Sequence, residues 1–363
     1  MDNLFLIFFH QKIICVNQPQ QGSTRIIIKI NMRKLQSLLI VLLMVLVLPV
    51  QRTMAQAVQK GTPVYLGDPT ILNDKGVYYL YGTGQTADKG FTVFTSTDLK
   101  TWMKPHTGRN GGFVLEKGSK TFGSKGFWAP QVVAINNKFC MLYTADENIA
   151  IAWSNSPFGP FVQNKVAPLS PDTKQIDPFL FIDDNGKKYL YHVRLGGGNK
   201  IYVAELKDDF SGIVDNTLTL CITAEAGWEN TKGVSQSPIT EGPTVMKHKG
   251  MYYMFYSAND FRNIDYAVGY ATSKSPLGPW KKYQKNPIIS RSMIGHNGTG
   301  HGDLFKDQKG NLQYVFHVHN SDSTVSPRQT FITGLRFIPN KKTGMDEVCI
   351  EKNSLITPLL IKK

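Results

Sequence analysis

Short apolar and aromatic runs recur along most of the chain, and polar turns separate them. Five runs are rich in the β-branched and aromatic residues typical of buried strands, at residues 77–84, 139–145, 188–193, 251–258 and 312–319. Each run follows another short apolar segment and a turn rich in Asn, Asp, Gly and Lys, which favour tight hairpins. The pattern therefore predicts five β-hairpins.

A third apolar segment follows four of these hairpins, at residues 91–102, 149–161, 201–210 and 268–280. Each unit is thus a small antiparallel sheet, and the units recur every 48 to 64 residues without strong helical periodicity between them. Such repeats are typical of sheets arranged radially around an axis. We expect an all-β, five-bladed β-propeller in a single domain. A β-sandwich or jelly roll also has many short strands, but would not need the same hairpin with a third strand to recur five times.

The most apolar segment, residues 38–50, is too short to span a bilayer. It follows the basic pair Arg33 and Lys34 and precedes a stretch of small residues at 53–57, an order typical of a secretory signal. With a start at Met32, we expect an upstream extension at 1–31, a signal peptide at 32–57 and the propeller at 58–363. The expected location is periplasmic or extracellular, without membrane attachment after signal removal. A lone membrane anchor is the alternative.

The composition, with 41% hydrophobic and 19% charged residues, is that of a soluble globular protein. Removal of residues 1–57, which hold six Lys or Arg residues and one acidic residue, lowers the net charge from +14 to +9. These charges are spread through Lys-rich turns, so we expect no nucleic-acid partner. Cys140, Cys221 and Cys349 show no CxxC spacing and predict no metal knuckle or disulfide framework. We expect a monomer.

The entrance to the first strand of each repeat carries the candidate chemistry. The five entrances read GDP at 67–69, WAP at 128–130, IDP at 176–178, EGP at 241–243 and GHG at 300–302. Because the first strand of each propeller blade lines the central channel, Asp68, Asp177 and Glu241 should converge on one pocket. Turn chemistry alone explains a single Asp-Pro pair, but carboxylates at three matching entrances favour a catalytic site.

With these motifs the chain resembles glycoside hydrolase family 43, over roughly residues 65–338. The resemblance rests on residues 67–71, 126–132, 175–183, 241–258 and 298–305. It implies a five-bladed propeller that acts on arabinose- or xylose-containing polysaccharides. It also implies that Asp68 is the general base, that Glu241 is the general acid, and that Asp177 holds Glu241 and raises its pKa by like-charge proximity.

Carboxylates on separate blades can stand about 6.5 to 9.5 Å apart, which leaves room for a water and predicts inversion of the anomeric configuration. The sequence contains no GxSxG motif and no HExxH motif, so neither acyl chemistry nor a hydrolytic zinc is expected. We expect no cofactor for the chemistry.

Three further residues are candidates for substrate binding. Trp128 offers an apolar face for a sugar ring, although it could be a core residue, as we expect for Phe127. The resemblance implies that His301 lies at the pocket floor, near a structural calcium that a lone His cannot define. Gly302 and Asp303 depart from the family pattern there. Arg328 resembles an Arg that contacts sugar hydroxyls or the acid, and a surface Arg is the alternative. His319 and Asn320 could line the rim.

The preferred hypothesis is an exo-acting α-L-arabinofuranosidase that trims plant polysaccharide side chains. A β-xylosidase, a galactofuranosidase and an endo-arabinanase are alternatives, because specificity depends on loops such as 196–200 and 224–238 rather than on the motifs. A catalytically inactive, carbohydrate-binding propeller would fit better if one of the three carboxylates were missing. A protein-interaction scaffold of the WD or kelch type lacks support, since the repeats carry neither signature.

Overall fold

The computed structural model describes residues 61–361 except 226, 233 and 236. They belong to one compact unit, Lys60–Lys363. The predicted upstream extension and signal peptide lie outside the described residues. Within the described part of the chain, no helix is long and apolar enough to cross a membrane.

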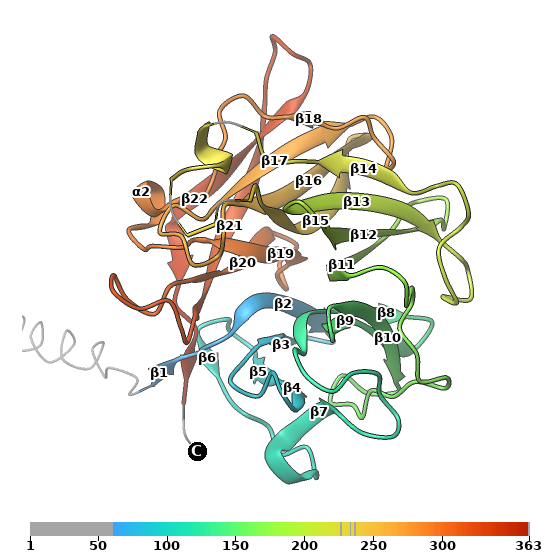
Figure 1. The fold of residues 1–363 in the computed structure, drawn as a ribbon. Helices are drawn as coiled ribbons and strands as arrows, with labels where there is room; N and C mark the ends of the chain where they lie inside the picture. The colour runs from blue at the N-terminus through green and yellow to red at the C-terminus, as the bar shows by residue number, and fades with distance from the viewer. Residues whose placement is uncertain (1–60, 226, 233, 236, 362–363) are drawn as a thin grey trace, which may run out of the picture. The chain divides into compact units, whose positions relative to one another are not determined.

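Five antiparallel sheets surround a common axis (Figure 1). Blade I has β2 (Gly67–Asp74), β3 (Val77–Thr83) and β5 (Phe94–Ser96), and blade II has β8 (Trp128–Ile135), β9 (Lys138–Ala145) and β10 (Asn148–Ser154). Blade III has β11 (Gln175–Ile182), β12 (Lys188–Leu195), β13 (Asn199–Leu206) and β14 (Thr219–Ile222). Blade IV has β15 (Thr240–His248), β16 (Met251–Ala258), β17 (Ala267–Ser273) and β18 (Lys281–Lys282). Blade V has β19 (Gly300–Lys306), β20 (Leu312–Val318), β21 (Gln329–Pro339) and β22 (Asp346–Ile356).

The first strands of the blades form a closed ring. Each of β2, β8, β11, β15 and β19 contacts the first strands of both neighbouring blades, including β19 against β2. The predicted five-bladed β-propeller is therefore confirmed, and the entrances of the five first strands share one end of the channel.

The two ends of the compact unit are fastened to blade I. β1 (Thr62–Pro63) pairs antiparallel with β23 (Leu359–Leu360), and β23 pairs in parallel with β6 (Thr101–Trp102). A separate ribbon of β4 (Gly90–Thr92) and β7 (Phe113–Glu116) lies beside blade I (Figure 1). The short helical turns are η1 (Asn110–Gly112), η2 (Gly227–Glu229) and α2 (Arg291–Ile294).

The outer strands are where the sequence prediction was incomplete. The five predicted hairpins and the four predicted third strands are present, but blade V also has the long pair β21 and β22. The sequence of β22 alternates polar, charged and apolar residues, as an edge strand does, so a search for apolar runs passes over it.

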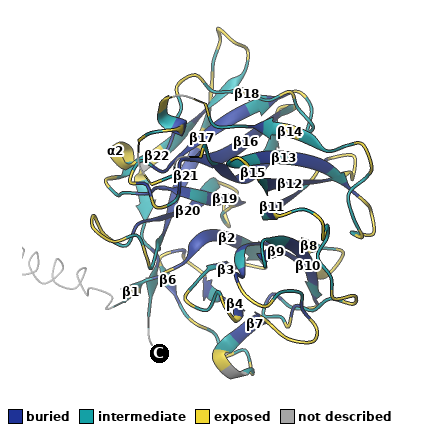
Figure 2. Ribbon diagram, in the orientation of Figure 1, coloured by how far each residue is buried: buried dark blue, intermediate teal, exposed yellow. Residues whose placement is uncertain are grey.

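The core lies between blades, where the inner and middle strands are buried (Figure 2). Between blades I and II, the ring of Phe91 lies 6.0 Å from that of Phe127 and 6.0 Å from that of Tyr143. Phe127 is fully buried, as predicted. In the described part of the chain, Cys140, Cys221 and Cys349 are free thiols.

A buried carboxylate ties three blades at the axis. Asp303 of β19 accepts hydrogen bonds from the hydroxyl of Thr70 on blade I, at 2.6 Å, and of Thr244 on blade IV, at 2.8 Å. This role accounts for the carboxylate at the position where the resemblance suggested a small polar residue.

We therefore expect Asp303→Ala to lower the free energy of unfolding by about 2 to 4 kcal/mol, because two buried hydroxyls lose their acceptor. Urea denaturation would measure the loss. The exposed Asp322 on the same blade provides the control Asp322→Ala. Equal stability of the two variants would contradict the proposed tie.

Candidate active site

The same β-bulge opens the first strand of all five blades. The register shifts between Gly67 and Thr70, Trp128 and Gln131, Ile176 and Phe179, Glu241 and Thr244, and Gly300 and Asp303. The second residue of each bulge has positive φ: Asp68 (49°), Ala129 (44°), Asp177 (55°), Gly242 (58°) and His301 (38°). Positive φ is uncommon for residues other than glycine, and bulges redirect side chains. The repeated bulge therefore presents the entrance residues to the channel.

The structure corrects the assumed equivalence of the three carboxylates. Asp68 and Asp177 occupy the second bulge position, but Glu241 stands one residue earlier, at the position of Trp128 in blade II. Gly242 occupies the second position in blade IV, where a Cβ atom would lie 2.8 Å from the ring of His301. The sequence motifs suggested matching entrances, yet the two kinds of carboxylate leave the backbone from consecutive residues.

Asp68 is held by a dense set of donors. Arg328 donates to both carboxylate oxygens, from Nη1 to Oδ1 at 2.6 Å and from Nη2 to Oδ2 at 3.0 Å. Thr83 donates its hydroxyl to Oδ2 at 2.6 Å. Nδ1 of His301 lies 3.2 Å from Oδ1. Such a bidentate Arg pair fixes both the position and the ionised state of the carboxylate.

The other two carboxyl groups have fewer partners. Asp177 accepts the backbone N–H of Gly242 at Oδ2, at 3.1 Å, and Nδ1 of His301 lies 3.6 Å from the same oxygen. Glu241 accepts the hydroxyl of Tyr266 at Oε1, at 2.9 Å, and the side-chain amide of Asn199 at Oε2, at 3.0 Å. Both carboxyl groups are buried.

These surroundings separate the proton affinities of the three groups. Burial alone would raise the pKa of Asp68, but the charge and hydrogen bonds of Arg328 outweigh it and hold the pKa well below its usual value. Burial, followed by the charge of Asp68, raises the pKa of Asp177 to about 8. Burial, followed by the charge of Asp177, raises the pKa of Glu241 to about 7. One carboxylate is thus ionised near neutrality, while the coupled pair retains protons. Burial is the larger cause of the raised pKa of Glu241, and the predicted like-charge effect adds to it when Asp177 is ionised.

The surroundings of His301 do not fit a directly ligated calcium. Its Nδ1 faces Asp68 and Asp177, and the oxygens of Asp303 already accept hydrogen bonds from two hydroxyls and one backbone N–H. Calcium requires about six to eight oxygen ligands. Within the described ranges of 61–361, no group of three or more His, Cys, Asp or Glu side chains could hold a metal ion. A structural calcium bound through water stays a prediction, and we assign no chemical step to it.

Trp128 and Arg328 both lie at the channel entrance. Trp128 is half-buried beside Gly126, where an added Cβ would lie 3.1 Å from its ring. Arg328 is only 12% exposed, so it is not a surface Arg. It contacts Asp68, whereas the resemblance suggested the sugar or the acid. Its guanidinium carbon also lies 4.9 Å from the ring centre of Phe261.

Sequence reasoning missed several residues that hold the carboxyl groups. Tyr266 and Asn199 hold Glu241, Thr83 holds Asp68, and His317 accepts the backbone N–H of Asp68 at 3.2 Å. His319 is buried, and its Nε2 forms a hydrogen bond with the carbonyl of Phe261 at 2.9 Å. The sequence carried one usable signal: Thr83 is the last residue, and His317 the last but one, of the middle strand of a blade, and each pairs with an entrance residue.

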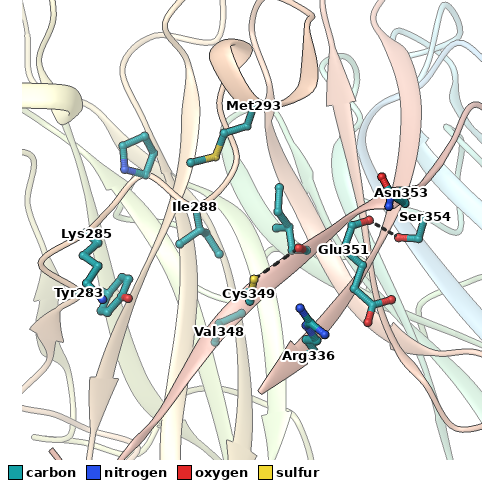
Figure 3. A pocket seen from close by; sticks show the side chains of 12 residues that line it. Tyr283, Lys285, Ile288, Met293, Arg336, Val348, Cys349, Glu351, Asn353 and Ser354 are labelled. Carbon is teal, nitrogen blue, oxygen red and sulfur yellow. Dashed lines mark hydrogen bonds between the residues drawn. The ribbon is translucent and has the colours of Figure 1, made fainter. Parts of the chain in front are cut away.

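Away from these residues, a hollow of about 860 Å³ lies between the segment 283–288, α2 and the outer strands β21 and β22 (Figure 3). Its lining includes Tyr283, Ile288 and Met293 on one side and Arg336, Val348 and Cys349 on the other (Figure 3). Of the lining residues, Glu351 alone has a carboxyl group. Hydrolysis by paired carboxyl groups therefore favours the channel entrance.

Comparisons with known proteins agree with this choice of site. The family model described as "Glycosyl hydrolases family 43" matches residues 62–342. A β-D-galactofuranosidase of Aspergillus niger is 26% identical over 76% of this chain and 82% of its own length. A xylosidase/arabinosidase of Bacteroides ovatus is 26% identical over 75% of this chain and 90% of its own length. The crystal structure of an endo-1,4-β-xylanase from Bacteroides thetaiotaomicron is 40% identical, with a TM-score of 0.74, and covers 84% of this chain and 99% of its own.

Proposed function

The chain belongs to glycosyl hydrolases family 43 and hydrolyses O-glycosyl bonds, and from this premise we propose that it is an inverting, exo-acting α-L-arabinofuranosidase. The observation that supports the proposal is the difference in protonation state between two carboxyl groups at the channel entrance. Asp68 is ionised by Arg328, while burial keeps Glu241 protonated near neutrality. Glycoside hydrolysis by paired carboxyl groups needs one carboxylate and one carboxylic acid in these states, and we propose inversion because Asp68 and Glu241 stand on separate blades.

In the proposed mechanism, Asp68 accepts a proton from the water that attacks the anomeric carbon. Glu241 gives its proton to the glycosidic oxygen as the bond to the anomeric carbon breaks. Asp177 shares the coupled titration of Glu241 and favours its protonated form. Hydrolysis in this family needs no cofactor. The products are a free sugar of inverted configuration and the leaving alcohol.

Aromatic side chains support binding of a sugar at this entrance. Trp128, from blade II, offers the face of a half-buried ring, and Phe261, from blade IV, covers the guanidinium of Arg328. C–H groups of a sugar pack against such faces while its hydroxyls meet polar groups. Phe261 packs against Arg328, and Asn199, at the start of β13, donates to Glu241. The proposed exo action requires that such residues narrow the entrance, so that it takes the end of a substrate rather than its middle.

The names of the relatives favour two other substrate classes as alternatives. The 40% identical neighbour is an endo-1,4-β-xylanase, which favours a xylose-containing substrate, and the relative from Aspergillus niger is a galactofuranosidase. Both activities would use the same three carboxyl groups, so they change the identity of the sugar and leave the mechanism as proposed.

The decisive test is hydrolysis of p-nitrophenyl α-L-arabinofuranoside, β-D-xylopyranoside and β-D-galactofuranoside, with NMR detection of the released anomer. Arabinoxylan and unsubstituted xylan should be digested in parallel and their products sized. Release of arabinose alone, inverted and without shorter xylan fragments, is the expected result. Internal xylan fragments would support the endo-xylanase alternative. Sugar binding without cleavage would support a non-catalytic carbohydrate-binding propeller.

The value of kcat/KM is expected to fall above pH 7, because the pKa of Glu241 is raised to about 7 and ionisation removes the acid. Two pH units above this pKa, the loss should reach about 100-fold. The acid limb should lie at low pH, since Arg328 holds down the pKa of Asp68. Rates on a natural oligosaccharide between pH 4 and 10 would measure both limbs. A flat profile up to pH 10 would refute the assignment of the acid.

Secretion is part of the proposal, because a polysaccharide substrate is encountered outside the cytoplasm. N-terminal sequencing of exported protein should give a start near Val58. A mature protein that retains residues 32–57 would overturn this part alone.

A further inference from the structure

The entrance bulges share a hydrogen-bonding rule. Each places a backbone N–H in the protein interior, where it needs an acceptor. In three blades the acceptor is a hydroxyl on the middle strand of the preceding blade. The N–H groups of Ala129, Asp177 and His301 donate to Thr83 at 2.9 Å, Thr144 at 3.1 Å and Ser257 at 2.7 Å, respectively.

The strand register shows that these hydroxyls occupy one repeated position. Thr83 pairs with Gly67, Thr144 with Trp128 and Ser257 with Glu241. The same position is Val193 in blade III, opposite Ile176, and His317 in blade V, opposite Gly300. Both exceptions serve a carboxyl group of the site.

The exception in blade III leaves one backbone N–H group, that of Gly242, without a hydroxyl acceptor. Val193 has no acceptor, so the N–H of Gly242 donates to the carboxylate of Asp177 instead. The exception in blade V replaces a hydroxyl with an imidazole, which accepts the N–H of Asp68 at Nδ1. A hydroxyl would have been enough for that bond alone, as the other blades show.

The imidazole of His317 reaches further than a hydroxyl would. The residue is fully buried, and its ring stacks on Tyr266 with centroids 5.6 Å apart and an interplanar angle of 16°. The hydroxyl of Tyr266 donates to Glu241. One side chain thus touches the backbone of Asp68 and the ring that holds Glu241.

The protonation state of His317 follows from its neighbours. The N–H of Asp68 lies 3.2 Å from Nδ1 and Nη1 of Arg328 lies 3.4 Å from Nε2, and a neutral imidazole can accept only one of these two hydrogen bonds. The shorter contact assigns the acceptor to Nδ1 and the proton to Nε2, which leaves the contact with Arg328 without a hydrogen bond. The charged or titratable groups around the ring are Asp68, Tyr266, His301, His319 and Arg328, whose Nη1 lies 3.4 Å from Nε2. Burial and the charge of Arg328 hold the pKa of His317 well below its usual value. The neutral ring therefore keeps its acceptor.

We propose that His317 is a positioning residue that aligns both reacting groups: it fixes the backbone of Asp68 through Nδ1 and the carboxyl group of Glu241 through its contact with Tyr266. The inference rests on the proposed roles of Asp68 and Glu241. It assigns to one buried side chain the relative placement of the base and the acid.

The His317→Thr variant tests the inference, because it restores the hydroxyl found in blades I and II and removes the ring. We expect kcat to fall about 10- to 100-fold with KM within about threefold of wild type, since small misplacement of reacting groups costs rate. The alkaline limb of the pH profile should move upward, because a weaker hydrogen bond from Tyr266 to ionised Glu241 raises its pKa.

The Tyr266→Phe variant keeps the ring and removes the hydroxyl. It should move the alkaline limb in the same direction, and the double variant should move it no further than the larger single effect, because both changes act on one contact. Gln313→Thr, at the other end of β20, is the control for substitution on this strand.

The possible outcomes separate the inference from the proposed function. If wild type cleaves no glycoside, the proposed function fails. If wild type is active but His317→Thr only lowers the melting temperature, with kcat per folded molecule and both pH limbs unchanged, His317 is merely structural and the inference is overturned.

Discussion

The Asp68→Asn variant is expected to fold and to lose about 10³- to 10⁴-fold in kcat/KM, the upper part of the range for loss of a general base. Asparagine keeps the shape of the side chain and one oxygen for Arg328 and Thr83, which both donate to Asp68 in wild type. It cannot take a proton from the attacking water. The loss should therefore appear with both activated and natural substrates, because every substrate needs the nucleophile.

The control is Asp74→Asn, at the far end of the same strand β2. Because Asp68→Asn leaves the buried Arg328 without its counter-ion, some loss of stability is also expected. Rates should be divided by the folded fraction, measured by circular dichroism at the assay temperature. Retention of more than a tenth of wild-type kcat/KM would show that another group activates the water.

The fold could be predicted because the same local sequence pattern recurs in each blade. An apolar strand, a polar turn and an aromatic strand specify a hairpin through local chemistry, and five such phrases in one chain leave few architectures. The pair β21 and β22 was not predicted. For β22 the reason is that an edge strand shares its surface with solvent and mixes Glu and Lys with Val and Ile. Closure by β23 on β6 joins segments far apart in sequence, and a two-residue strand carries no pattern.

The three carboxyl groups of the site could be predicted from the sequence, but most of the residues that form hydrogen bonds with them could not. Asp68 and Asp177 stand in conspicuous Asp-Pro entrances, but Tyr266 and Asn199 reach Glu241 from other strands and loops. Those contacts depend on how neighbouring strands and loops pack, which no local pattern encodes. The offset of Glu241 by one residue could have been read from the aligned entrances, since EGP carries its carboxylate at the first position and IDP at the second, while their bulges coincide.

The role of His317 becomes visible in the sequence only when the pairing register of the strands is known. Thr83, Thr144 and Ser257 are unremarkable hydroxyl residues until their pairing with the entrances is known. Once that position is aligned across the five blades, Val193 and His317 stand out because they break the rule. The two exceptions mark the backbone N–H groups that serve the site, since the N–H of Gly242 donates to Asp177 and the N–H of Asp68 donates to His317.

The Glu241→Gln variant is expected to lose about 10³-fold in kcat on an oligosaccharide, but less than about 10-fold on p-nitrophenyl glycosides. Glutamine fills the same space between Tyr266 and Asn199 but has no proton to give. A sugar alkoxide leaves poorly without protonation, whereas p-nitrophenolate is already a stable anion. The alkaline limb of the p-nitrophenyl profile should also disappear, because the group that titrates is gone.

Glu225→Gln, an exposed position in the preceding loop, is the matched control and should leave both rates unchanged. The comparison between the two leaving groups carries the test, since misfolding or weaker binding would lower both rates together. Equal losses on the oligosaccharide and the p-nitrophenyl glycoside would mean that Glu241 binds the sugar without protonating the leaving group. The acid would then have to be sought in Asp177, the other carboxyl group whose pKa is raised above neutrality, to about 8.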